Sequence, residues 1–210
     1  MTLTGVTLDG GLCIPPGARG VVLFAHGSGS SRLSPRNQFV ARELRKTGLA
    51  TLLFDLLTRD EERIDAFSGE LRFDIDFLAK RLVAATDWLS ARPDAHSLNI
   101  GYFGASTGAA AALVAAAQRP ETVRAIVSRG GRPDLAGDAL PRVEAPTLLI
   151  VGGNDTQVIH LNEAAMRQLH SASKLAIVPG ATHLFEEPGT LEQVAQLAAT
   201  WFQKYLAVTQ

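Results

Sequence analysis

Leu98-Asn99-Ile100-Gly101-Tyr102-Phe103-Gly104-Ala105-Ser106-Thr107-Gly108 runs directly into an alanine-rich segment, residues 109–117. The apolar residues at its start are typical of a short buried strand. The alanines that follow favour a helix more strongly than any other residue type. The sequence therefore predicts a strand, one abrupt turn and a helix, with Ser106 at the turn.

The turn carries glycine two positions before and two positions after Ser106, in the pattern G-x-S-x-G from Gly104 to Gly108. This is the spacing of a nucleophile elbow, in which a serine at the tip of a strand-to-helix turn has a strained backbone conformation. The two flanking positions crowd neighbouring strands, so both must lack a side chain. The pattern predicts that Ser106 is a nucleophile.

Composition and charge place the chain among ordinary globular proteins. Its 210 residues are 46% hydrophobic and 20% charged, which suits a single α/β domain over residues 1–210. The net charge of −1 argues against a nucleic-acid or membrane-surface partner bound by bulk electrostatics. No signal peptide or membrane-spanning segment is visible, and the single cysteine, Cys13, excludes an intramolecular disulfide. We therefore expect a cytoplasmic protein.

Strand and helix signals alternate along the chain. An opening hairpin is expected from Leu3–Leu8 and Leu12–Ile14 around the turn Asp9-Gly10-Gly11. Besides the strand and helix around Ser106, strands are expected at 21–25, 49–54, 123–128, 147–151 and 175–178, and helices at 35–46, 73–91, 160–170 and 191–205. Residues 58–72, which are charged and turn-rich, and residues 129–145, which lack periodicity, are expected to be loops. The alternation predicts a three-layer, doubly wound, mostly parallel sheet.

A serine nucleophile needs a base, and the base needs a carboxylate to orient it. After Ser106 the chain offers Asp155 on a glycine turn just beyond a predicted strand, and then His183 just beyond the last strand. The order Ser, Asp, His is the one that nucleophile-elbow enzymes use. Both residues follow strand C-terminal ends, the edge at which open parallel sheets bind ligands. Asp134 is the alternative orienting acid.

The loop after the first central strand, His26-Gly27-Ser28-Gly29-Ser30-Ser31, is expected to help bind a developing oxyanion. One donor should be the N–H of Thr107, which follows the nucleophile, and the second the N–H of Ser28. His26 is expected to shape the turn by hydrogen bonds to backbone. No Walker or Rossmann glycine pattern, His-Glu-x-x-His motif or cysteine pair is present, so we expect no cofactor and no metal.

The chain resembles the α/β-hydrolase fold and, within it, the small bacterial proteins of the dienelactone hydrolase family. The resemblance covers residues 21–205 and rests on His26 to Arg32, Gly104 to Gly108, Gly152-Gly153-Asn154-Asp155 and Thr182-His183. Dienelactone hydrolases proper use a cysteine nucleophile, whereas this position is Ser106 here. The resemblance therefore implies hydrolase chemistry without implying dienelactone as substrate.

Two further features bear on the substrate. Many lipases and epoxide hydrolases insert a helical cap after the strand at 123–128, where this chain has only residues 129–145. A capless site favours short acyl esters. Arg32, Arg36, Arg129 and Arg132 flank the expected active edge, and they could anchor loops. Alternatively, Arg32 or Arg129 could hold a substrate carboxylate.

These observations predict a serine hydrolase that cleaves small carboxylic esters through an acyl-enzyme, using Ser106, His183 and Asp155. A lactone or thioester hydrolase with the same three residues is the alternative within enzymes. A non-catalytic α/β-hydrolase that serves as a binding module is the alternative from another class. The expected partner is a small-molecule ester, and the sequence leaves the oligomeric state open.

Overall fold

The computed structural model describes residues 1–3 and 5–207 and is built on a seven-stranded sheet of order β3-β5-β4-β6-β7-β8-β9. Only β3 runs antiparallel to its neighbour. The strands are β1 (Thr2–Leu3), β2 (Val6–Thr7), β3 (Gly10–Cys13), β4 (Gly20–Ala25), β5 (Ala50–Phe54), β6 (Asn99–Ala105), β7 (Val123–Arg129), β8 (Thr147–Gly152) and β9 (Ser173–Val178). The predicted mostly parallel, doubly wound sheet is confirmed.

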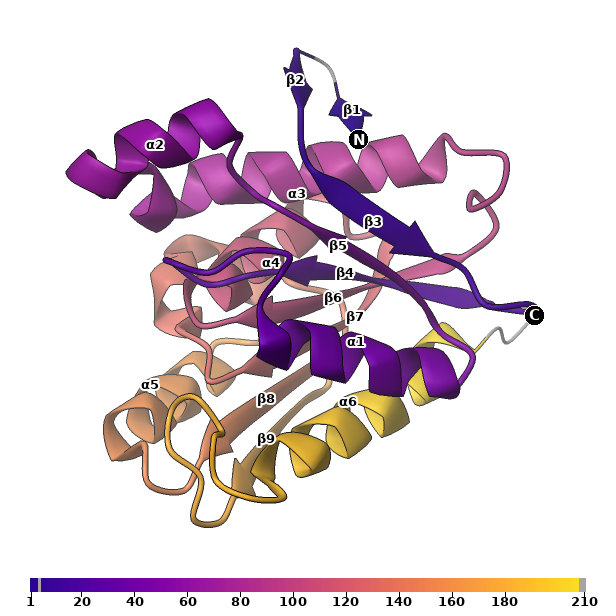
Figure 1. The fold of residues 1–210 in the computed structure, drawn as a ribbon. Helices are drawn as coiled ribbons and strands as arrows, with labels where there is room; N and C mark the ends of the chain where they lie inside the picture. Colours follow the sequence, from indigo (N-terminus) through magenta and orange to yellow (C-terminus); the bar gives the residue numbers. More distant parts are fainter. Residues whose placement is uncertain (4, 208–210) are drawn as a thin grey trace.

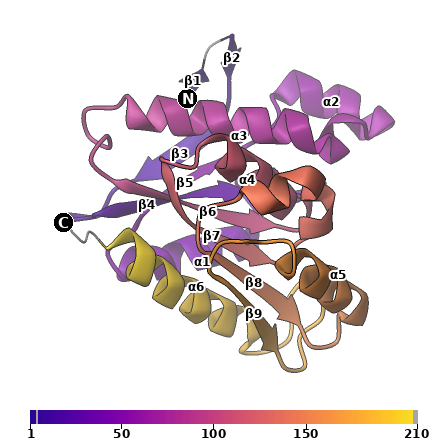
Figure 2. The same ribbon diagram turned by 180° about the vertical axis from the view of Figure 1, so that it is seen from behind.

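Helices cover both faces of the sheet. They are α1 (Pro35–Lys46), α2 (Arg59–Ser68), α3 (Ile75–Ser90), α4 (Thr107–Gln118), α5 (Thr156–Met166) and α6 (Thr190–Leu206), with 3₁₀ segments η1 (Leu71–Phe73) and η2 (Pro133–Arg142). Helices α1 and α6 lie together on one face in Figure 1, and α3, α4 and α5 lie on the other in Figure 2. Each face buries its own apolar cluster against the sheet, which gives the three layers.

The three central strands bring the predicted loops to one edge. Strand β6 lies between β4 and β7, with Ala25 opposite Gly104 and Ala105 opposite Arg129. Because these strands are parallel, the loops that follow all three emerge side by side. The segment after Ala25, the turn at Ser106 and the segment after Arg129 therefore meet at the C-terminal edge of the sheet.

Local signals account for the helix that follows β4. The Ser34 hydroxyl accepts a hydrogen bond from the N–H of Asn37, and Pro35 occupies the first helical position, as expected. Arg45 and Lys46 lie in the last turn, where positive charge is favourable. This helix, α1, has the predicted bounds, and its N-terminus lies near the active edge.

The predicted opening hairpin is wrong. Instead β1 pairs with β2, and β3 pairs antiparallel with the distant β5. The expected strand Leu3–Leu8 is interrupted at Gly5, which has φ +79°, and Thr4 within it lies outside the described residues. Strand β3 thus gains a partner that is remote in sequence, which local turn signals do not specify.

The loop predicted for residues 58–72 is also wrong, because it contains α2 and η1. Thr58 and Glu61 form a reciprocal capping box at the start of α2, and Gly69 ends the helix with φ +69°. The helix predicted from residue 73 begins instead at Ile75, after the Asp74 cap.

Two predicted segments further along the chain also differ from the structure. The loop predicted for 129–145 contains η2, whose backbone is kinked at Gly137. The helix predicted at 160–170 is α5, which begins four residues earlier at Thr156 and ends at Met166. No helix among the described residues is long and apolar enough to cross a membrane.

Candidate active site

Ser106 forms the tip of an abrupt turn between β6 and α4, in a backbone conformation that is rare for a residue with a side chain. Its φ is 50° and its ψ is −122°. Such a conformation costs on the order of 1–3 kcal/mol and persists only where the surroundings impose it. Here the N–H of Ser106 donates to the carbonyl of Arg129 at 3.3 Å, and the carbonyl of Ser106 accepts from the N–H of Arg132 at 3.1 Å. The elbow is therefore held by the end of β7.

The glycines on either side of Ser106 are required by close packing. A Cβ at Gly104 would lie 2.4 Å from the Cα of Ala109, and one at Gly108 would lie 2.2 Å from the carbonyl oxygen of Ala25. Both distances are to backbone atoms, which a side chain cannot push aside. The G-x-S-x-G pattern thus lets α4 approach the sheet closely enough to hold Ser106.

We expect Gly108→Ala to lower the free energy of unfolding by about 1–3 kcal/mol or more, because the new methyl group overlaps the backbone of β4. Urea unfolding followed by circular dichroism measures this loss. Gly11→Ala is the matched control, since a Cβ at Gly11 meets nothing within 4 Å, and its expected effect is within about 0.5 kcal/mol. Equal stability of the two variants would contradict the packing argument.

The expected acid and the expected base lie on neighbouring loops. Asp155 follows β8 and precedes α5, and His183 lies in the turn after β9. The Nδ1 atom of His183 is 2.7 Å from Oδ2 of Asp155. A Cβ at Gly152 would lie 2.4 Å from the carbonyl oxygen of Ala181, so these two loops pack backbone to backbone. This geometry fixes the imidazole with Nε2 available for proton transfer.

The end of β7 joins the imidazole to the elbow. A Cβ at Gly130 would lie 3.5 Å from both Nδ1 and Cε1 of His183. The residue before it, Arg129, accepts the N–H of Ser106. In the described part of the chain no hydrogen bond joins the Ser106 hydroxyl to His183. Such contacts are often long before substrate binds, so the geometry remains compatible with a nucleophile and its base.

The alternative acid, Asp134, faces another partner. Its two carboxylate oxygens accept hydrogen bonds from Nε and Nη2 of Arg132, at 2.9 and 2.7 Å. This bidentate pair joins neighbouring residues at the start of η2. The structure thus brings Asp155, and not Asp134, into contact with His183.

The loop after β4 lies against Ser106. A Cβ at Gly27 would be 3.0 Å from the Cβ of Ser106. The N–H of Ser28 points toward the same region, where it donates to the hydroxyl of Thr107 at 2.9 Å. Thr107 is the first residue of α4, so its own N–H has no acceptor within the helix. Both expected oxyanion donors are therefore near Ser106, and the Thr107 hydroxyl currently accepts one of them.

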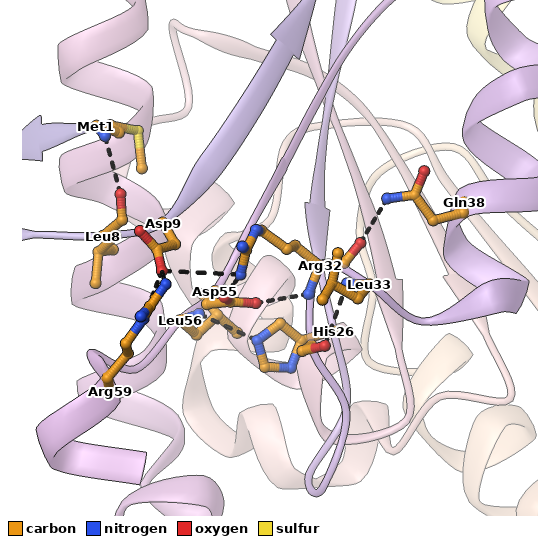
Figure 3. A network of polar contacts seen from close by, with 11 residues as sticks. Met1, Leu8, Asp9, His26, Arg32, Leu33, Gln38, Asp55, Leu56 and Arg59 are labelled. Atoms are coloured by element: carbon orange, nitrogen blue, oxygen red, sulfur yellow. Dashed lines mark hydrogen bonds and ion pairs between the residues drawn. The ribbon is translucent and has the colours of Figure 1, made fainter.

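His26 ties the loop after β4 to the loop after β5. Its Nδ1 lies 3.0 Å from the carbonyl oxygen of Gly27, and its Nε2 accepts the N–H of Leu56 at 3.1 Å, a contact visible in Figure 3. This pattern requires a neutral ring with the proton on Nδ1. Burial lowers the pKa of His26 below its ordinary 6.5, against the opposing effects of the Gly27 carbonyl and the carboxylates of Asp55 and Glu62. The predicted role of His26 in shaping the turn is confirmed.

We expect His26→Ala to lower the free energy of unfolding at pH 8 by about 1–3 kcal/mol, since the Leu56 N–H loses its acceptor. The folded protein binds a proton at His26 less readily than the unfolded chain does. Stability that the wild type owes to neutral His26 is therefore complete above pH 6.5 and declines as the pH falls below that value.

The difference between wild type and His26→Ala should accordingly narrow between pH 8 and pH 5 in urea unfolding experiments. His160→Ala provides the control, because the His160 side chain is 79% exposed. A difference that stays constant with pH, or one that His160→Ala reproduces, would contradict this role of His26.

The two arginines considered for a substrate carboxylate are both engaged or buried. The Arg32 guanidinium pairs with Asp55 and lies 4.0 Å from Asp9, as drawn in Figure 3. Arg129 is only 7% exposed, and its side chain lies near Asn37 of α1 and the ring of Phe185. Arg32 could hold a substrate only by giving up Asp55. A substrate-binding role for either residue stays a prediction.

A cavity of about 240 Å³ opens beside the loop after β4. It lies between that loop, the end of β5 and α2, and its lining includes Ser28. The lining from α2 and η1, which the sequence prediction missed, comprises Glu62, Asp65, Ala66 and Arg72. The Thr58–Glu61 capping box could have revealed this helix. Among the described residues, no group of three His, Cys, Asp or Glu side chains is arranged to hold a metal ion.

Comparison with known proteins identifies the family and the fold. The model of the dienelactone hydrolase family matches residues 8–208. A crystal structure of dienelactone hydrolase from Anabaena variabilis superposes with a TM-score of 0.96, at 64% identity over 98% of this chain and 95% of that chain. Est1E of Butyrivibrio proteoclasticus, solved with ferulic acid, shares the fold with a TM-score of 0.82 at 18% identity, over 99% of this chain and 98% of its own.

A curated relative in Mycobacterium tuberculosis, provisionally named a phosphoribosyl transferase, is 60% identical over 201 residues. The alignment covers 96% of this chain and 44% of the relative, so the chain spans less than half the length of that protein. The family match extends over nearly the whole chain and includes Ser106, Asp155 and His183. The chain belongs to the dienelactone hydrolase family.

Proposed function

We propose that this protein is a serine hydrolase of small carboxylic esters. The observation that carries the proposal is the convergence of a strained Ser106 with a hydrogen-bonded pair, His183 and Asp155, on the C-terminal edge of the sheet. The strained backbone at Ser106 destabilises the fold. A turn that exposes a nucleophile explains why this strain is present. The family and the fold are those of hydrolases and esterases.

In the proposed reaction, the Ser106 hydroxyl attacks the ester carbonyl while Nε2 of His183 takes its proton. Asp155 keeps the His183 proton on Nδ1 and stabilises the imidazolium that forms. The N–H groups of Thr107 and Ser28 bind the oxyanion, and the Thr107 hydroxyl, which accepts the Ser28 N–H in the structure, moves aside for the substrate at that stage. His183 then protonates the leaving alcohol and activates the water that hydrolyses the acyl-enzyme.

The preference for short acyl groups follows from the shape of the active edge. Between β7 and β8 the chain has only η2 and short connections, so no helical cap is inserted between these two strands. The cavity beside Ser28 measures about 240 Å³, which suits a small group and not a long alkyl chain. A long chain would remain in water and gain little from burial.

A series of p-nitrophenyl esters tests this function. We expect kcat/KM for the acetate and butyrate esters to exceed that for the palmitate ester by about tenfold or more, because the added methylenes find no apolar channel. A preference for palmitate would contradict the capless interpretation. Covalent labelling of Ser106 without turnover of any p-nitrophenyl ester would instead indicate a specialised ester, a lactone or a thioester as substrate.

The name of the Mycobacterium tuberculosis relative does not conflict with this proposal. This chain corresponds to 44% of that protein, so the transferase activity in its name can belong to the remainder. We assign the hydrolase activity to the part that the two proteins share. The expected cytoplasmic location and small-molecule partner stay predictions.

A further inference from the structure

Arg129 is a buried cation without an acidic partner. It is 7% exposed, and among the described residues the single hydrogen bond of its guanidinium runs from Nη2 to Oδ1 of Asn37, at 3.5 Å. Its Nε is buried and has no acceptor. The guanidinium carbon lies 5.9 Å from the centroid of the Phe185 ring. Burial of an uncompensated charge is costly, so this arrangement requires an explanation.

A second arginine increases the positive charge at this position. The charge of Arg36 is close enough to act with burial in lowering the pKa of Arg129 to about 10. Arg36 donates from Nη1 to Glu186 at 3.1 Å, but its own Nε is also buried without an acceptor. Among the described residues Glu186 is thus the partner of Arg36 alone, and the Glu186 side chain is 65% exposed.

The N-terminus of α1 adds to the same field. Arg36 and Asn37 lie in the first turn of this twelve-residue helix, where the helix macrodipole places a partial positive charge. The first turn contains no acidic residue. Two guanidiniums, each with a buried Nε that has no acceptor, therefore lie at a helix N-terminus, and only Arg36 is paired with a carboxylate, the exposed Glu186.

A purely structural role does not explain the charge. Contact with the Phe185 ring could be made by a methionine or leucine, which would avoid the desolvation of a guanidinium. The guanidinium differs from these residues in presenting a planar fork of donors, which matches the oxygens of carboxylate, phosphate or sulfate. The chemistry of the unused donors therefore indicates an oxoanion.

We propose that Arg129 and Arg36, with the first turn of α1, form a binding site for a small oxoanion of the phosphate type. The site lies beside Phe185 and Glu186, in the same turn as His183, and is separate from the cavity at Ser28. It does not depend on the proposed esterase function. The ligand is free phosphate or the phosphate group of a small organic molecule, since both present the same oxygens.

Thermal unfolding at constant ionic strength tests the site, with sodium chloride replaced stepwise by sodium phosphate. At hundredfold excess over Kd, we expect the Tm of the wild type to rise by about 5–10 °C with a saturating dependence on phosphate. The non-specific stabilisation by phosphate does not saturate and is shared by all variants. Phenyl phosphate in place of phosphate distinguishes the two sources, because it shifts the Tm only if the site admits an esterified phosphate.

Arg129→Met is the decisive variant. It should lose the saturating shift and, without phosphate, have a Tm equal to or above that of the wild type, since it removes an unpaired buried charge. Arg124→Met is the matched control on the same strand, because Arg124 is exposed, and it should retain the shift. If Arg129→Met does not fold, Arg36→Gln serves in its place and should also lose the shift. No saturating shift in the wild type, or one that persists in Arg129→Met or Arg36→Gln, would overturn the proposal.

Discussion

Ser106→Ala is expected to lower kcat for a p-nitrophenyl acetate substrate by about 10⁴–10⁶-fold, the loss typical of removing a triad nucleophile. The variant keeps the oxyanion donors and the acyl site, so a residual rate above that of water should remain. A positive φ strains alanine and serine to a similar degree, so the free energy of unfolding should change little. Steady-state kinetics and urea unfolding measure the two quantities.

Ser97→Ala is the control for this experiment. Ser97 is exposed and precedes β6 at the end opposite to Ser106. The control should retain wild-type kcat and KM. A Ser106→Ala variant that keeps more than about one-tenth of the wild-type kcat would show that another group attacks the ester.

Asp155→Asn should lower kcat by about 10³–10⁴-fold, with KM nearly unchanged. An asparagine amide at this position can donate to Nδ1 of His183, which would place the imidazole proton on Nε2 and leave no base facing Ser106. It also removes the negative charge that stabilises the imidazolium. The expected loss is therefore in the chemical step, because Asp155 acts through His183.

Asp134→Asn is the matched comparison, since Asp134 is the other carboxylate that the sequence offers. It pairs with Arg132 and not with His183, so kcat should stay within about twofold of the wild type. The reverse result, with a large loss in Asp134→Asn and none in Asp155→Asn, would show that the acid had been assigned to the wrong loop.

The residues of the elbow could be predicted because their constraints are local. The elbow needs a strand before Ser106, glycines on either side of it and small residues at the start of α4. All of these requirements concern residues that are close together in sequence. The positions of Asp155 and His183 followed from a second local signal, a polar residue directly after a buried strand. Parallel pairing then brings such residues to one edge without any detailed knowledge of packing.

Helix α2 shows where the sequence alone was insufficient. Its large apolar side chains, Ile64 and Phe67, are 67% and 94% exposed, so the helix has no buried apolar stripe. Periodicity therefore gave no signal, and only the Thr58–Glu61 capping box and Gly69 marked its ends. The cavity that α2 lines was missed for the same reason.

The features that the sequence did not predict also include contacts between residues far apart in the chain. The pairing of β3 with β5 joins residues about forty positions apart, and turn signals near Gly10 favoured a local hairpin instead. The burial of Arg129 depends on α1 and Phe185, which lie far from it in sequence. The bond between the Ser28 N–H and the Thr107 hydroxyl spans 79 positions and depends on the closeness of β4 and β6.

Covalent labelling with a fluorophosphonate tests the assignment of Ser106 most directly. After reaction and proteolysis, mass spectrometry locates the adduct in wild type, Ser106→Ala and His183→Ala. A single adduct on Ser106 in the wild type, none in Ser106→Ala and much slower labelling in His183→Ala is the result that the proposed mechanism requires. An unlabelled wild type, or an adduct that persists in Ser106→Ala, would show that Ser106 is not an activated nucleophile.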